Sequence, residues 1–207
     1  MNGLTLVRCS YFVAFLACLC PLDRGQAQTA SNAPPRGILA SGEVHDNVYT
    51  NEAIGLQFSV PSALKFKSPS LKGQPETVLT IAAVWREPSA RGGAAFYAED
   101  LGYHGADRST EAYVKRLVNA QRKLGFDRVE AKGYAQLDER VRFARVDFQQ
   151  PHLYEAVFVK ACDVYAFVFV FDAADLESTN NLIAQTNVKL DAKHSGCRAA
   201  KSASSPG

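Results

Sequence analysis

The eight consecutive apolar or aromatic residues from Val164 to Phe171 constrain this chain more than any other feature. In an extended strand, alternate side chains point to opposite faces, so the aromatic residues of this run face one way and the smaller aliphatic residues the other. Both faces are apolar, which is typical of a strand in the middle of a sheet covered on both sides. The run is too short to span a bilayer as a helix. Left exposed it would aggregate, so the rest of the domain must cover it.

The N-terminal stretch has the pattern of a secretory signal peptide, and we expect cleavage after Ala27. Arg8 precedes the apolar run Cys9–Leu22, and small residues stand just before the cut. A retained membrane anchor and a lipoprotein attached at Cys18 are the alternatives. The apolar run is short for an anchor, and Phe15 stands where a lipobox usually has Leu. We therefore expect a bacterial protein that is periplasmic or secreted and has no transmembrane segment after signal removal.

Cysteine usage agrees with export. Three of the five cysteines lie in the predicted signal, and the mature chain keeps Cys162 and Cys197. Two cysteines in an oxidising compartment can pair, so we predict a disulfide, with two separate thiols as the alternative. Closing a loop of this length would stabilise the fold by roughly 3–4 kcal/mol in the chain-entropy model. The spacing fits no metal-binding pattern.

The charge balance is close to neutral. The chain has 23 basic and 21 acidic residues, and removing the signal takes away two basic residues and one acidic residue, which leaves 21 against 20. A balanced chain gives no general reason to bind nucleic acid, so we expect no nucleic-acid partner. Any electrostatic recognition must come from a local patch.

The chain is predicted to form a single domain. We expect a signal peptide over 1–27, a flexible linker over 28–46, one domain over 47–192, and a tail over 193–207 that is disordered beyond Cys197. Alternation and helical periodicity indicate strands first, then a helix, a run of antiparallel strands and a second helix. This order predicts an α+β domain, with a mainly antiparallel sheet flanked by helices. The expected strands are 48–50, 56–60, 77–85, 94–98, 128–134, 140–148, 153–161, 164–171 and 188–190, and the expected helices are 109–124 and 173–186.

Two finer expectations concern irregular parts of this pattern. The stretch 62–73 reads as a loop with one apolar turn near Phe66. In 140–148 the apolar residues change phase, which indicates a β-bulge or a change of burial along that strand.

No catalytic or cofactor-binding motif is present, and we expect no cofactor. One acidic cluster precedes the first helix and consists of Glu99, Asp100, His104 and Asp107. Carboxylates and an imidazole are able to ligate a divalent metal or act as acid and base. The alternative is a solvated polar loop in which Asp107, or the nearby Ser109, caps the helix.

The outer face of the first helix is the strongest interaction candidate. It carries basic residues at positions three, four and seven apart, which share a helix face. Such a surface would dock an acidic partner or anionic headgroups, although a solvated helix face has the same composition. The residues are Lys115, Arg116, Arg122 and Lys123, with Arg128 just beyond.

Aromatic residues are numerous, and they serve either a ligand cleft or an ordinary core. Trp85, the only tryptophan, lies at the end of its strand, where the mouth of a pocket would be. We take Trp85 and Tyr97 as the pocket candidates.

The start of the domain resembles PsbP-like domains. It reads Tyr49-x-Asn51-x-x-x-Gly55-x-x-Phe58-x-x-Pro61, and the order of the later elements is similar as well. Many members of this family have a tryptophan three residues after the proline, where this chain has Leu64. The family includes extrinsic photosystem II subunits, a Ran-binding nuclear import factor and exported bacterial proteins. The resemblance implies a fold that mostly binds partners, and it supplies no catalytic residues.

These observations predict an exported envelope protein that acts as a non-catalytic binding or accessory module. Its partner would be another envelope protein or a small ligand. Two alternatives stay open: a small secreted metal-dependent hydrolase that uses the acidic cluster, and a lipid or small-molecule carrier with a cleft near Trp85.

Overall fold

The structure, a computed structural model, describes residues 42–67, 78–87, 92–101, 107–123, 126, 128–138, 140–162, 165–195 and 197. The predicted signal peptide, the predicted linker up to residue 41, His104 and the tail after Cys197 lie outside the described residues. Within the described ranges, no helix is long and apolar enough to cross a membrane.

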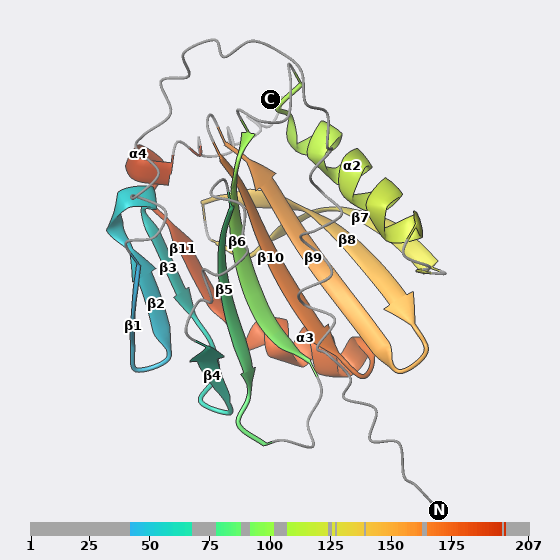
Figure 1. The fold of residues 1–207 in the computed structure, drawn as a ribbon, viewed down its shortest axis with the longest axis horizontal. Coiled ribbons are helices and arrows are strands. Elements are labelled where there is room, and N and C mark those ends of the chain that lie inside the picture. Colours follow the sequence, from blue (N-terminus) through green and yellow to red (C-terminus); the bar gives the residue numbers. More distant parts are fainter. Residues whose placement is uncertain are drawn as a thin grey trace, which may run out of the picture.

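The larger of two sheets has seven strands in the order β4-β5-β6-β10-β9-β8-β7, and each neighbouring pair is antiparallel (Figure 1). The predicted central strand is β10, which lies in the middle of this sheet and is buried along its whole length. The strands are β4 (Leu64–Lys67), β5 (Val78–Trp85), β6 (Gly93–Asp100), β7 (Arg128–Gln136), β8 (Arg142–Gln150), β9 (Leu153–Ala161) and β10 (Tyr165–Ala173).

The smaller sheet has four antiparallel strands in the order β1-β2-β3-β11. The C-terminal strand lies at one edge of it. This sheet brings the beginning and the end of the domain together, as Figure 1 shows on its left. Its strands are β1 (Glu43–His45), β2 (Val48–Asn51), β3 (Leu56–Ser59) and β11 (Asn187–Leu190).

Four helical segments join or cover the sheets, and the two longer ones agree with the predicted helices. Ser109 caps the first, since its Oγ accepts from the Ala112 N–H at 3.1 Å. Asp175 caps the second by accepting from the Ser178 N–H at 2.7 Å. The segments are η3 (Glu52–Ile54), α2 (Thr110–Lys123), α3 (Leu176–Ala184) and α4 (Ala192–Ser195).

The alternation along β10 divides the core into two parts. Its aromatic face packs against the small sheet and α3, and the ring of Phe169 lies 5.5 Å from Phe58 and 5.6 Å from Phe143 in edge-on contacts. Its aliphatic face, which includes Val168, packs on the side covered by α2. The α+β class predicted from the sequence is therefore confirmed, with a central strand covered on both faces.

The structure corrects three finer predictions and confirms a fourth. The sheet is not single, because the N-terminal hairpin and β11 form a sheet of their own. β1 lies inside the range predicted as linker; Asp46 and Asn47 both have positive φ (46° and 61°), as in the tight turn that joins paired strands. The stretch predicted as loop contains β4, which pairs with the end of β5. The phase change predicted in 140–148 is a change of burial along β8: Phe143 lies in the aromatic core, whereas Val146 and Phe148 lie in the core on the α2 side. A bulge lies in the partner strand β7, between Ala131 and Gly133.

Candidate binding surfaces

Helix α2 presents one face to the core and the opposite face to solvent. Tyr113, Leu117 and Gln121, one turn apart, are buried. The helix packs on β8 and β9 (Figure 1), and the Ala161 N–H donates to Thr110 Oγ1 at 3.0 Å. This packing fixes the orientation of the helix, so the residues on its other side form a stable surface.

Three of the predicted basic residues on that outer side are exposed: Lys115, Arg122 and Lys123. Among the described residues, none of the three has an acidic partner within ion-pair distance. Arg122 and Lys123 lie in the last turn, where a positive charge also interacts favourably with the helix dipole. Arg128, at the start of β7, is exposed as well.

Arg116 was predicted to lie on this face, but its side chain contacts other residues of the protein. Its guanidinium lies 5.6 Å from the ring centroid of Tyr113, and Nη1 donates to the Asp107 carbonyl at 3.4 Å. Its side chain therefore lies back along the helix towards the helix start. We define the α2 basic face as the exposed residues Lys115, Arg122 and Lys123.

The predicted acidic cluster is mostly engaged in local structure. Glu99 is buried and accepts from the Tyr113 hydroxyl at 2.6 Å, and burial, with smaller effects from Glu99, raises the pKa of Tyr113. Asp107 accepts from the Ser109 N–H at 3.1 Å, and hydrogen bonds with Ser109 lower its pKa. Asp100 lies opposite Tyr165 at the end of β6, and His104 is outside the described residues. Among the described residues, no group of three or more His, Cys, Asp or Glu is arranged to hold a metal.

The two predicted pocket residues lie on opposite faces of the large sheet. Trp85 packs with the aromatic core, whereas Tyr97 belongs to the core on the α2 side. Trp85 lines a cleft of about 600 Å³ between the end of β5 and α3. The other lining residues are Ala63, Arg86, Glu87, Ala173, Ala174, Ser178, Asn181, Leu182 and Gln185.

Arg86 holds one wall of this cleft in place. Its Nε donates to the carbonyl of Ser62 at 2.8 Å and to that of Leu64 at 3.2 Å, and Nη2 contacts Asn47 Oδ1 at 3.4 Å. The guanidinium thus joins the turn before β4 to the end of β5. This role of Arg86 was not predictable from the sequence, because the carbonyls that bind it are more than twenty residues away in the chain.

The other wall, α3, is fixed to the sheet by polar contacts. Arg145 forms two hydrogen bonds with the buried Asp147, at 2.7 and 3.1 Å, and also donates to Asn180 of the helix at 3.1 Å. Thr179 donates from its hydroxyl to the Tyr154 carbonyl at 3.1 Å. With both walls held in this way, the cleft is a preformed feature.

A buried pair of carboxyl groups was not anticipated from the sequence. Glu155 and Asp172 lie directly opposite each other on β9 and β10, and each has one oxygen with no hydrogen-bond partner among the described residues. Burial, with the nearby Asp172, raises the pKa of Glu155 to about 8, and burial raises the pKa of Asp172 to about 7. The pair was detectable in principle, since Asp172 continues the same alternation as Val168 and Val170 and so falls on a buried face.

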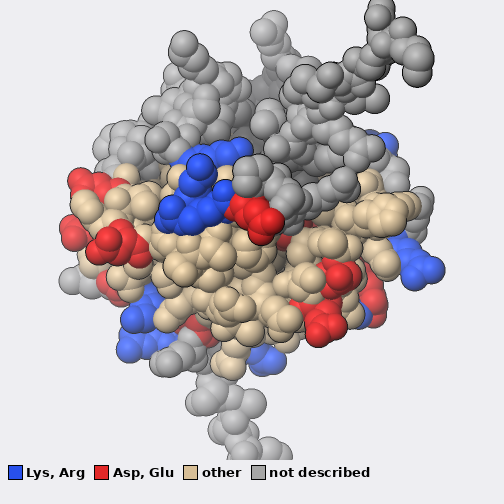
Figure 2. All heavy atoms as spheres, turned by 90° about the horizontal axis from the view of Figure 1, so that it is seen from below, with Lys and Arg blue, Asp and Glu red and all other residues tan. Residues whose placement is uncertain are grey.

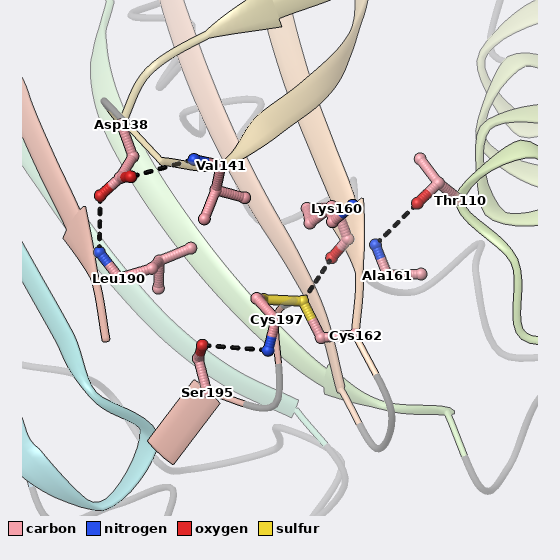
Figure 3. Close-up of a disulfide and its surroundings, with 9 residues drawn as sticks. All are labelled: Thr110, Asp138, Val141, Lys160, Ala161, Cys162, Leu190, Ser195 and Cys197. Carbon is pink, nitrogen blue, oxygen red and sulfur yellow. Dashed lines mark hydrogen bonds between the residues drawn. A yellow bond between two sulfur atoms is a disulfide. The ribbon is translucent and has the colours of Figure 1, made fainter. Parts of the chain in front are cut away.

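Cys162 and Cys197 form the disulfide predicted from the sequence, with Cα atoms 4.7 Å apart (Figure 3). Nearby, the Cys197 N–H donates to Ser195 Oγ at 3.1 Å. The carboxylate of Asp138 accepts from the N–H groups of Val141 and Leu190 at 3.1 and 2.9 Å. The disulfide and these bonds fasten the C-terminal segment to the large sheet. The dashed line in Figure 3 between Cys162 Sγ and the carbonyl of Lys160 is a contact only. It is not a hydrogen bond, because a disulfide sulfur has no proton.

Comparison with known proteins gives a likeness of fold. No protein-family model matches the chain, and no curated protein matches it. Among solved structures, the PsbP protein of the cyanobacterium Synechocystis matches over 80% of this chain and 98% of its own, with 12% identity and a TM-score of 0.45. The Saccharomyces cerevisiae Ran-binding protein Mog1p matches over 69% of this chain and 82% of its own, with 11% identity and a TM-score of 0.40.

A mutant of Mog1 also matches, over 63% of this chain and 78% of its own, with 11% identity and a TM-score of 0.40. The resemblance to PsbP-like domains indicated by the start of the domain is thus found again in the search of structures. At this identity the likeness concerns the fold, and no argument about function follows from it.

Proposed function

We propose that this protein is an exported, non-catalytic binding module of the bacterial envelope that docks an acidic surface of a partner protein through the α2 basic face. The observation that carries this proposal is the set of exposed cations on a rigidly packed helix, with no acidic partner among the described residues. Because the whole chain is close to neutral, the attraction would be local to this helix.

Export is supported by the signal-like N-terminus and by the disulfide, since structural disulfides persist in oxidising compartments. The hydrolase alternative loses support because two of its four candidate residues have structural roles. Glu99 accepts a hydrogen bond from Tyr113, and Asp107 organises the start of α2. A metal or an acid–base pair would have to compete with those contacts.

The test is crosslinking of a tagged copy in intact envelopes, followed by mass spectrometry of crosslinked peptides. One variant carries Glu at Lys115, Arg122 and Lys123. A matched control carries Glu at Lys65, Lys67 and Lys189, which are exposed and lie on β4 and β11. Both variants change the net charge by the same amount, so only the position of the charge differs.

We expect crosslinks from α2 to an acidic stretch of one partner, lost in the α2 variant and kept in the control. The complex should also weaken as salt rises, because exposed charges are screened. Loss of the partner in both variants, or retention in both, contradicts the proposal. Binding of the purified protein to vesicles of anionic lipid without any protein partner would also overturn it in favour of membrane docking.

A further inference from the structure

The carboxyl pair Glu155–Asp172 lies where helix α3 is attached to the large sheet. Asp172 is the last residue but one of β10, and α3 begins shortly after it, at Leu176. Glu155 follows Tyr154 near the start of β9, and the carbonyl of Tyr154 accepts from the Thr179 hydroxyl of α3 at 3.1 Å. The pair and this attachment therefore share the same ends of two neighbouring strands.

The side chains of the pair face the α2 side of the sheet, in phase with Val157 and Val170 of that core. Each carboxyl group is buried and has one oxygen without a hydrogen-bond partner among the described residues. Within the same part of the chain, no basic side chain lies within ion-pair distance of either group. A negative charge here would therefore have neither water nor a cation to stabilise it.

The other titratable groups of the neighbouring elements do not neutralise the pair. On β6, Tyr97 keeps its proton, because burial and the two nearby carboxyl groups raise its pKa, and Glu99 accepts from Tyr113 of α2. On β8, Arg145 and Asp147 bind each other on the opposite face, where Arg145 lies over an aromatic ring of the core. The basic residues of α2 lie on its outer side or at its start, as described above.

This arrangement makes the closed strand ends sensitive to pH. Directly opposite residues of antiparallel strands have Cβ atoms about 4.5–5.5 Å apart, so two ionised carboxylates would repel each other strongly in this buried place. The pKa of Glu155 is raised to about 8 and that of Asp172 to about 7. Opening returns both groups to water, where they release their protons more readily. Rising pH therefore favours the open form, by up to about tenfold per pH unit for each group.

We propose that the pair is a pH-sensitive switch that controls the attachment of α3. While both groups are protonated, the ends of β9 and β10 stay paired and α3 stays on the sheet. When both are ionised, these ends open locally and α3 is released, since strand ends open at a lower cost than the whole domain. The cleft beside Trp85 then loses a wall, because Ala173 and Ala174 line it between β10 and α3. None of this depends on docking by α2.

Surface charge gives no competing reason for α3 to leave the sheet. The end of β10 and α3 lie at the bottom of Figure 1, and Figure 2 views the molecule from that side. Among the described residues seen there, acidic and basic groups are interspersed with uncharged ones, so no single sign of charge dominates. The expected pH response therefore comes from the buried pair.

The single tryptophan makes release of α3 observable, because Trp85 lines the same cleft as the helix. We would measure quenching of its fluorescence by acrylamide from pH 5 to pH 9. Quenching should increase as the pH rises towards and beyond about 8. Far-ultraviolet circular dichroism should stay unchanged over this range, because the opening is local. A parallel loss of the circular dichroism signal would mean global unfolding and would contradict the proposal.

Variants assign the response to the pair. Glu155→Gln with Asp172→Asn has the shape of the protonated pair but cannot ionise, so quenching should stay low at every pH. Asp46→Asn with Glu52→Gln makes the same change of charge at exposed positions and should respond like the unsubstituted protein. Histidines also change charge between about pH 5 and 8, so His152→Asn, in the turn before β9, is a further control and should leave the response intact.

Hydrogen exchange at pH 6 and 8.5, corrected for the intrinsic exchange rates, locates the opening. The end of β10 and α3 should lose protection at the higher pH, and α2 should keep it. Should the double variant not fold at pH 5, Glu155→Gln alone should reduce the pH dependence from about two protons to about one. The inference is overturned if quenching does not change with pH, if the change persists in the double variant, if His152→Asn removes it, or if both helices lose protection together.

Discussion

At the scale of single residues, the pattern that resembles PsbP-like domains at the start of the domain proves to be structural. Tyr49 and Phe58 are buried in the aromatic core, and Asn51 accepts from the Ile54 N–H while its amide donates to the Tyr49 hydroxyl. Gly55 has a φ of 62° and its carbonyl accepts from the Asp191 N–H at 2.7 Å. The pattern therefore specifies how the N-terminal hairpin meets the end of the chain, and it says nothing about a ligand.

Gly55→Ala is expected to destabilise the protein by about 1–3 kcal/mol. The alanine would have to adopt a left-handed backbone conformation, and its Cβ would lie within about 3 Å of Asp191 and His194. Gly133→Ala is the matched control, since Gly133 also has positive φ but has open space around it. Urea unfolding would measure both. Equal losses of unfolding free energy would show that the crowding at Gly55 contributes nothing.

The buried carboxyl pair Glu155–Asp172 should make the stability of the folded protein depend on pH. Both pKa values are raised in the folded state, from 4.5 to about 8 and from 3.8 to about 7. The folded protein therefore binds more protons than the unfolded chain between these limits, and its stability falls as pH rises from about 4 to about 8.

Glu155→Gln should flatten that fall and make the protein more stable than the unsubstituted chain at pH 8.5, by an amount on the order of a few kcal/mol. Thermal unfolding at pH 5, 7 and 8.5 is the measurement. Glu52→Gln, at an exposed position on η3, is the control and should follow the unsubstituted protein. A Glu155→Gln curve parallel to the unsubstituted one would mean that Glu155 ionises freely in the fold.

At the scale of elements, α2 depends on its cap and on the apolar stripe that faces the sheet. Ser109→Ala removes the acceptor of the Ala112 N–H and should cost about 1 kcal/mol. Hydrogen exchange would show faster exchange in the first turn of α2 and unchanged exchange in α3, which Asp175 caps separately. An equal effect on both helices would indicate a global loss of stability rather than a lost cap.

The edge strand β7 contains a bulge that the sequence pattern did not locate. Most of its residues are exposed, and it carries Arg128, Glu130 and Lys132 together with the bulge at Gly133. Charges and a bulge are common means of preventing an edge from pairing with another chain. The phase change in β8 is a separate feature, a change of burial along a strand that pairs regularly with β9. The bulge in β7 has no signal in the sequence, because most residues of that strand are exposed and show no apolar alternation.

Across the whole molecule, the strands and helices with strong periodicity were predictable, and the partners of each were not. The unbroken apolar run identified β10 as central and the spacing of apolar residues identified α2, since both patterns are local. That the hairpin β2–β3 joins β11 in a second sheet depends on contacts such as Val188 opposite Phe58, which are far apart in the chain. The candidate cleft was foreseen only at Trp85, because its other wall comes from α3.

The disulfide between Cys162 and Cys197 is a further contact between distant parts of the chain. Replacing Cys162 and Cys197 together by Ala should lower the unfolding free energy by about 3–4 kcal/mol, as expected for a separation of 35 residues. Chemical unfolding with and without a reductant is the measurement: the unsubstituted protein should lose this stability on reduction, and the double variant should not respond. A reductant effect of the same size on the double variant would place the sensitivity elsewhere.

The place of β10 in the large sheet has a consequence for the order in which this protein is made. β4, β5 and β6 come from one part of the chain and β7, β8 and β9 from the next, whereas the strand that joins the two halves is built after both. If the earlier strands pair as they do in the complete domain, a chain that ends before residue 165 would leave the inner edges of β6 and β9 open. Open edges of this kind favour pairing with other chains. The large sheet is therefore completed only once β10 has been made.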